Sequence, residues 1–178
     1  MAPSPFKTLL ALSLLWPLGL SPLQSTAGEL TDVSDGPRLQ LSLPDLDGRQ
    51  RNLDEFIGKV VLIDFWASWC MPCIEEMPRI KRLAEQMRDH PFTVIGINVG
   101  EAERRVRATV NRLGVDFTVL LDKDSEVFRA WGANVLPTAY VFDREGRVRY
   151  IARGPIRWDE TEMTDRLLAL IETEPPSE

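Results

Sequence analysis

The chain has 178 residues, of which 44% are hydrophobic and 27% are charged, the balance of an ordinary soluble globular protein with a single core. Its 27 acidic residues outnumber its 21 basic ones, so the net charge is −6 at pH 7. The sequence has no cluster of basic residues to offset this negative charge, which argues against nucleic acid as a partner. The arginines between Glu101 and Arg112 lie among acids and indicate a solvated helix face.

The first 27 residues have the layout of an export signal rather than of a folded domain. Lys7 precedes TLLALSLLWPLGL, an apolar run of 13 residues that Pro17 interrupts. Ser25-Thr26-Ala27 then has the small-x-small form of a cleavage site. The run is short for a membrane span, although an uncleaved segment would act as an anchor. We therefore expect residues 1–27 to be a signal peptide, and the protein to be periplasmic or, if the segment is retained, anchored to the membrane.

The rest of the chain alternates between strand and helix patterns. Residues 28–37 are polar and rich in turn formers, which predicts a linker before a folded domain over residues 38–178. Periodicity and turn residues predict, in chain order, a hairpin over 39–53, a buried strand over 59–68, a helix over 73–88, a strand over 92–99, a helix over 101–113, a strand over 117–122, a short helix over 124–131, a strand pair over 138–143 and 147–153, and a helix over 159–173. This order predicts an α/β fold with a mixed sheet.

The only two cysteines, Cys70 and Cys73, lie where the first buried strand runs into a helix, and three kinds of site compete for them. As a structural disulfide they would close a ring of four residues, which contributes only about 2 kcal/mol. A structural zinc site lacks ligands, because His90 is the only histidine, so we expect no metal. A redox pair fits well, since a helix N-terminus favours a thiolate at Cys70 and places Cys73 to resolve a mixed disulfide.

The segment DFWASWCMPC resembles the active-site segment of thioredoxins, and WGANVLPT resembles the loop that faces it in that family. The wider pattern resembles more closely the TlpA/ResA/DsbE class of exported thiol–disulfide oxidoreductases, through Cys70-x-x-Cys73-x-x-Glu76-x-Pro78, a helix inserted after GINV, and LPTAYVFDREGRV. The resemblance covers about residues 39–171. It implies a thioredoxin-like fold, with a central mixed sheet flanked by helices, an N-terminal β-hairpin and an inserted helix after the second core strand.

The resemblance also implies a set of substrate-binding residues around the cysteines. In the family the proline that matches Pro137 forms a cis peptide bond, and the residue that matches Leu136 pairs with an incoming substrate strand. Trp69 offers an apolar docking surface. Met71 and Pro72, which stand between the cysteines, complete the set of expected substrate contacts.

Two acidic residues are candidates for the group that accepts a proton from Cys73. Asp64 stands among apolar neighbours in VVLIDFW, and burial there raises the pKa of a carboxyl group toward neutrality. The matching thioredoxin residue is also an aspartate and has this role, whereas many TlpA-like proteins use the glutamate that matches Glu76. This chain has both residues, so the sequence leaves the choice between them open.

The residues between the cysteines bear on the direction of the reaction. Strong oxidants usually have a histidine there, whereas this chain has Met71 and Pro72, so we predict a reductase of protein disulfides that needs no cofactor. A monomer receiving electrons from a membrane thiol donor is expected, and the family implies an apocytochrome c haem-attachment site as an example of a substrate. Two alternatives are a disulfide oxidase or isomerase using the same site, and a Cu(I) chaperone with Met71 or Met77 as additional ligand.

Overall fold

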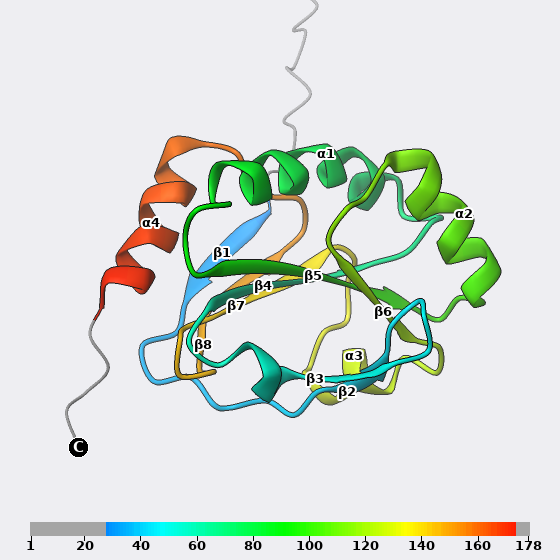
Figure 1. Ribbon diagram of the computed structural model, residues 1–178, viewed down its shortest axis with the longest axis horizontal. Helices are drawn as coiled ribbons and strands as arrows, with labels where there is room; N and C mark the ends of the chain where they lie inside the picture. The colour runs from blue at the N-terminus through cyan, green and yellow to red at the C-terminus, as the bar shows by residue number, and fades with distance from the viewer. Residues whose placement is uncertain (1–27, 174–178) are drawn as a thin grey trace, which may run out of the picture.

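The computed structural model describes residues 28–173, which build a central sheet covered by helices on one face and by a hairpin and a short helix on the other (Figure 1). The elements in chain order are β1 Glu29–Asp32, β2 Ser42–Pro44, β3 Gln50–Asn52, the 3₁₀ turn η1 Leu53–Phe56, β4 Val60–Trp66, α1 Met71–Gln86, β5 Phe92–Val99, α2 Glu103–Leu113, β6 Thr118–Asp122, α3 Glu126–Ala130, β7 Thr138–Phe142, β8 Val148–Arg153 and α4 Thr161–Glu172.

The central sheet has six strands in the order β1-β8-β7-β4-β5-β6, and β2 pairs with β3 in a separate hairpin. Strands β4, β5 and β6 are parallel, whereas β7 pairs antiparallel with β4, β8 with β7 and β1 with β8. The predicted α/β fold with a mixed sheet, an N-terminal hairpin and a helix inserted after β5 is therefore confirmed.

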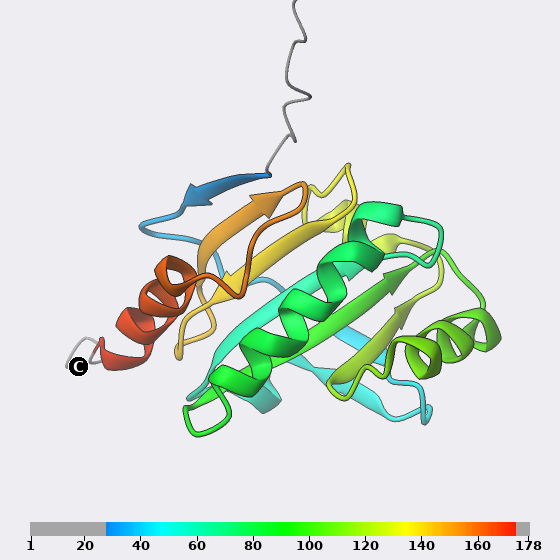
Figure 2. The ribbon, with the colours of Figure 1, turned by 90° about the horizontal axis from the view of Figure 1, so that it is seen from above.

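Strand β4 lies in the middle of the sheet, and all seven of its residues are buried because both faces of the sheet are covered. Its side chains alternate between the two faces. Phe65 belongs to the cluster that η1 and α3 close, whereas Leu62 belongs to the cluster under α1 and α4. At the end of the strand, Trp66 packs into a third cluster between α1 and α2. Figure 2 shows α1 lying across the strands it covers.

The prediction of a linker over residues 28–37 is wrong for its first part, because Glu29–Asp32 forms β1. This strand pairs with β8 through its backbone, and Leu30 packs against the cluster under α1 and α4. Edge-strand pairing uses main-chain groups, which every residue has, so the polar composition of the segment did not indicate it.

The start of β1 lies beside the loop that follows β8. The Gly28 N–H donates a hydrogen bond to the carbonyl oxygen of Pro155 at 2.7 Å, and the Gly154 N–H donates to that of Pro137 at 2.9 Å. A Cβ atom at Gly28 would lie 2.5 Å from the Gly154 carbonyl group, so only glycine fits this approach. The beginning of the described chain is thereby fixed beside the loop after β8, which is itself hydrogen-bonded to Pro137.

Between residues 28 and 173, no helix combines the length and apolar character that crossing a membrane requires. The expected signal peptide or anchor over residues 1–27 falls outside the described residues.

Candidate active site

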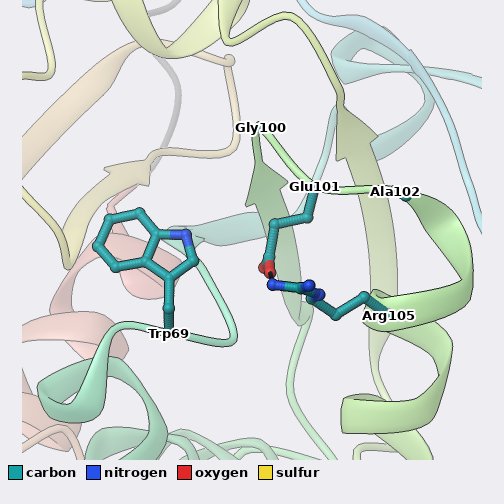
Figure 3. A pocket seen from close by; sticks show the side chains of 5 residues that line it. All are labelled: Trp69, Gly100, Glu101, Ala102 and Arg105. Atoms are coloured by element: carbon teal, nitrogen blue, oxygen red, sulfur yellow. Dashed lines mark ion pairs between the residues drawn. The ribbon is translucent and has the colours of Figure 1, made fainter.

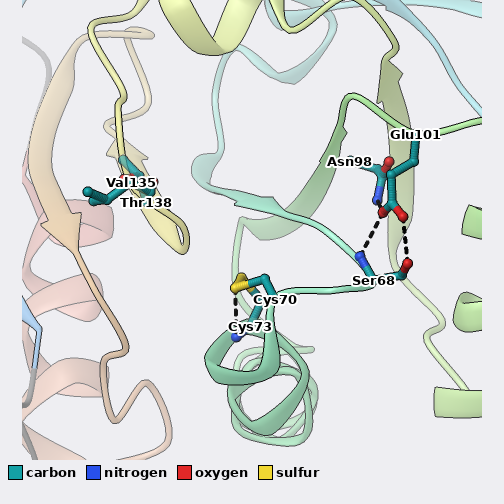
Figure 4. The surroundings of a disulfide bond; sticks show 7 residues. All are labelled: Ser68, Cys70, Cys73, Asn98, Glu101, Val135 and Thr138. Atoms are coloured by element: carbon teal, nitrogen blue, oxygen red, sulfur yellow. Dashed lines mark hydrogen bonds between the residues drawn. A yellow bond between two sulfur atoms is a disulfide. The ribbon is translucent and has the colours of Figure 1, made fainter.

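The cysteines lie at the end of the sheet where the three parallel strands β4, β5 and β6 terminate. The loops after β4 and β5 leave from this edge, and Pro137 immediately precedes β7, which starts there. Figure 4 shows the disulfide at the start of α1, with the Val135–Thr138 loop on one side and Glu101 on the other. Loops at the carboxyl ends of parallel strands are where α/β proteins place their functional groups.

Cys70 and Cys73 form a disulfide with an S–S distance of 2.08 Å. Cys70 is the N-cap of α1, and its sulfur accepts a hydrogen bond from the backbone N–H of Cys73 at 3.3 Å. The helix begins at Met71 rather than at Cys73, because Pro72 fits the first turn, where no N–H is needed. Cys70 keeps 5% of its residue surface exposed and Cys73 none, so Cys70 is the more accessible of the two cysteines to a reacting sulfur.

Apolar side chains form the surface around the disulfide. Trp69 and Met71 are 67% and 64% exposed, and Pro72 is exposed beside them. Across the site, the predicted cis peptide bond between Leu136 and Pro137 is present, with Leu136 partly buried and Pro137 buried. All five expected substrate contacts therefore lie on the two segments that meet at the disulfide.

Val135, which the sequence did not single out, is exposed in the same region, and its carbonyl oxygen accepts a hydrogen bond from the Thr138 hydroxyl at 2.8 Å. The two tryptophans of the motif have different environments. Trp66 is fully buried, whereas Trp69 is mostly exposed, so only the second is available to a substrate.

Asp64 and Glu76 both lie in the interior and interact with each other. Asp64 is fully buried with neither carboxyl oxygen hydrogen-bonded, so burial, and then the nearby Glu76 carboxylate, hold its pKa well above its usual range. Burial also raises the pKa of Glu76 to about 7. Three neighbours oppose this rise: the Ile156 N–H, which donates a hydrogen bond to the Glu76 carboxylate at 2.8 Å, the Trp158 indole and the Arg79 guanidinium. Cys73 and Glu76 are one helical turn apart on the buried face of α1.

Glu101, which the sequence placed at the start of the helix predicted over 101–113, instead lies before α2, is buried and fixes the loop before Cys70. Its carboxylate accepts hydrogen bonds from the Ser68 N–H at 2.6 Å, the Ser68 hydroxyl at 2.5 Å and the Asn98 amide at 2.8 Å (Figure 4). Burial alone would raise the pKa of Glu101, but these hydrogen bonds lower it. One feature of the sequence could have indicated this role for Glu101: it follows Asn98, a polar residue near the end of a largely apolar strand, by three positions.

The methionines considered as copper ligands lie in unlike environments, since Met71 is exposed and Met77 is buried in the core. Among residues 28–173, no three histidine, cysteine, aspartate or glutamate side chains are grouped so that they could hold a metal ion.

Comparisons with known proteins agree with this site. The family model for the AhpC/TSA family matches residues 37–151. The thiol-disulfide oxidoreductase ResA of Geobacillus thermodenitrificans is 33% identical over 149 residues, which are 83% of this chain and 86% of that protein. A crystal structure of a putative thiol:disulfide interchange protein DsbE from Chlorobium tepidum has 26% identity and a TM-score of 0.70, covering 80% of this chain and 99% of that one.

The structure of MTB DsbF in its mixed oxidized and reduced forms is 30% identical with a TM-score of 0.67, covering 75% of this chain and 96% of that chain. The residues that the family model matches include both cysteines and the loop that carries Pro137. The chain therefore belongs to the thioredoxin-like AhpC/TSA family, and within it to the thiol–disulfide oxidoreductases that resemble ResA and DsbE.

Proposed function

We propose that this protein reduces disulfide bonds in other proteins outside the cytoplasm, with electrons supplied by a membrane thiol donor. The observation that carries the proposal is the unequal burial of the two cysteines, since Cys70, at the N-cap of α1, keeps a little exposed surface and Cys73 keeps none. A haem-attachment site of apocytochrome c is one protein disulfide of the kind expected as substrate. The proposed working form is the monomer, with residues 1–27 directing export.

In the proposed reaction, the Cys70 thiolate attacks one sulfur of the substrate disulfide. A mixed disulfide forms and the first substrate thiolate leaves. Cys73 then loses its proton, and its thiolate attacks the sulfur of Cys70. This step forms the Cys70–Cys73 disulfide and releases the second substrate thiolate. Two electrons pass from the dithiol to the substrate, and the donor later returns them by the reverse exchange.

We assign the acceptance of the Cys73 proton to Glu76 rather than to Asp64. A pKa of about 7 allows Glu76 to be ionised for part of the time at neutral pH, and the residue lies one helical turn from Cys73. Asp64 has no hydrogen-bond donor to stabilise its charge, and burial, followed by the Glu76 carboxylate, raises its pKa well above its usual range, which favours the protonated form. In this assignment Asp64 is a neutral neighbour that limits the negative charge beneath the disulfide.

The surroundings of the sulfurs favour a reductant over an oxidant. A disulfide is a strong oxidant when its reduced form is stabilised, mostly through a stabilised thiolate. Here the Cys70 sulfur accepts one hydrogen bond, from the Cys73 N–H, and the residues between the cysteines carry no charge. Asp64 on β4 and Glu76 on α1 are acidic, so neither brings the positive charge that would stabilise a thiolate.

The first test is the reduction potential of the Cys70–Cys73 pair in residues 28–178, measured by equilibration with a thiol redox buffer. We expect a value near that of thioredoxin, about −270 mV, together with reduction of insulin by the dithiol form. A value near −120 mV with no reduction of insulin would instead support a disulfide oxidase.

A further inference from the structure

Two hollows flank the exposed indole of Trp69 and share Trp69 and Arg105 in their walls. The first, of about 300 Å³, lies between the indole and the ion pair of Glu101 with Arg105 (Figure 3). The second, of about 420 Å³, continues along α2. We call the two together the Trp69 groove; the residues that matter below are Trp69, Glu101, Arg105, Ala108, Thr109 and Arg112.

The α2 side of the Trp69 groove is positively charged. Arg105 and Arg112 are seven residues apart, so they lie two turns apart on the same helix face. Ala108 lies between them, and its small side chain leaves room for a ligand. Within residues 28–173, Arg112 makes no ion pair or side-chain hydrogen bond that would occupy its guanidinium group.

Arg105 is only weakly engaged. Its side chain is 68% exposed, and its nearest carboxylate oxygen belongs to Glu101 at 3.9 Å. That carboxylate already accepts three hydrogen bonds from Ser68 and Asn98, so it holds the Arg105 guanidinium loosely. By contrast, Arg107 on the same helix lies outside the groove and pairs with Glu103 at 3.0 Å. The groove therefore presents two available guanidinium groups in a protein whose net charge is −6.

The position of the groove connects it with the reaction, because Trp69 directly precedes Cys70, the residue that attacks the substrate disulfide. Resting on the proposed function, we propose that the Trp69 groove binds an acidic segment next to the disulfide of the protein substrate. An apolar side chain of the segment packs on the indole, and its carboxylates pair with Arg105 and Arg112.

The geometry of α2 sets the spacing of those carboxylates. Seven residues of helix rise about 10 Å, and three residues of an extended chain in the polyproline II conformation rise about 9 Å and bring the side chain back to the same side. The segment that fits the groove thus has two acidic residues three positions apart. Opposite charges near the site also speed the encounter of two proteins, so the effect should appear in the rate of the first exchange step.

The test uses two disulfide-bonded peptides that differ only in two residues three positions apart, which are glutamates in one and glutamines in the other. Each is mixed with the reduced protein, and the second-order rate constant of reduction is measured. We expect the acidic peptide to react faster, and Arg112→Gln to slow it roughly two- to fivefold at low salt, the effect of one exposed ion pair. The difference should shrink at high salt, where exposed charges are screened.

Arg104→Gln is the matched control, because Arg104 is also exposed on α2 but does not line the groove. It should leave the preference for the acidic peptide unchanged. Equal rates for the two peptides, equal effects of the two variants, or an Arg112→Gln variant that slows both peptides alike would overturn the groove proposal. If the wild-type protein reduces neither peptide nor insulin, the proposed function itself fails.

Discussion

At the scale of single residues, the two sulfurs of one disulfide have different environments. Cys70 is at the N-cap of α1 with 5% of its surface exposed, whereas Cys73 is enclosed between α1 and the sheet. An external sulfur therefore meets Cys70 first, and the enclosed Cys73 acts only after the first exchange has opened the ring. The order of the two steps follows from this difference.

Replacing Cys73 by serine should stop the reaction after its first step. The Cys73→Ser variant should accumulate a mixed disulfide between Cys70 and a substrate peptide, which mass spectrometry under non-reducing conditions would detect. Cys70→Ser is the control and should give no adduct, because the remaining sulfur is buried. An adduct of similar yield on Cys73 would contradict the assignment of the attacking residue.

The assignment of Glu76 as proton acceptor predicts different effects for two conservative variants. Glu76→Gln should slow the release of substrate from the mixed disulfide about 100-fold at pH 7, the usual effect of losing a general base. Asp64→Asn resembles the protonated carboxyl and should have a much smaller effect. Single-turnover kinetics across pH 5 to 9 would measure both, and a larger loss in Asp64→Asn would reverse the assignment.

Residues whose roles depend on local pattern were predictable, and those that depend on tertiary contacts were not. The positions of Cys70, Cys73 and the cis bond at Pro137 follow from short motifs. Glu101 was not predicted as part of the site, because its burial depends on Ser68, 33 residues earlier in the chain. Trp66 and Trp69 are only three residues apart, but β4 ends at Trp66, which leaves the first indole in the core and the second at the surface.

At the scale of elements, Glu101 joins two loops. Its carboxylate lies in the loop after β5 and binds Ser68 in the loop between β4 and α1, so it connects the ends of neighbouring strands. The loop that carries Trp69 and leads to Cys70 is therefore held by a charged acceptor rather than by packing alone.

Glu101→Gln should destabilise the oxidised protein by about 1–3 kcal/mol, because a neutral amide cannot accept all three hydrogen bonds and leaves buried donors unsatisfied. Urea unfolding at pH 7 would measure this change. Glu103→Gln, a neutralisation two residues away that removes only a partly exposed ion pair with Arg107, is the matched control and should change the free energy of unfolding by less than about 1 kcal/mol. Equal effects of the two variants would mean that the Ser68 contacts contribute nothing.

Strand β1 is a second element whose contribution can be isolated. A chain that begins at residue 38 lacks β1 and exposes the edge of β8. We expect it to unfold at a lower urea concentration than a chain that begins at residue 28, because it loses a row of backbone hydrogen bonds and the packing of Leu30. Identical midpoints for the two chains would show that the pairing does not stabilise the fold.

At the scale of the whole molecule, the buried acids give stability a dependence on pH. Glu76 has a pKa of about 7 in the folded protein and an ordinary value near 4.5 when unfolded. Between these values the folded state binds the proton and the unfolded state does not, so stability present at low pH is lost as the pH rises toward 7. Asp64, whose pKa is also raised, acts in the same direction.

The oxidised protein should accordingly be more stable at pH 5 than at pH 8, and Glu76→Gln should reduce the difference. The upper bound for Glu76 is about 3 kcal/mol, from a shift of its pKa between about 4.5 and 7. Urea unfolding at the two pH values measures the effect. Glu101, with its lowered pKa, stays ionised over this range and does not obscure it. A wild-type protein that is no less stable at pH 8 would contradict the raised pKa of Glu76.

The fold as a whole was predictable because the spacing of apolar residues along the sequence differs clearly between the strands and the helices. The continuous apolar runs that became β4 and β5 require cover on both faces, and the amphipathic segments that became α1 and α4 supply it on one face. The pattern did not predict β1, the edge strand that pairs with β8 through main-chain atoms.

The register of β1 also decides from which side of the protein its N-terminal segment departs. Glu29 is paired with Arg153, which is itself paired with Thr138 beside Pro137. Gly28 thus stands at the same rim of the sheet as the disulfide, three strands away in the order β1-β8-β7-β4, or roughly 14 Å at the usual strand spacing. Any tether attached through residues 1–27 would therefore join the folded protein at its reactive rim rather than at the opposite end of the molecule.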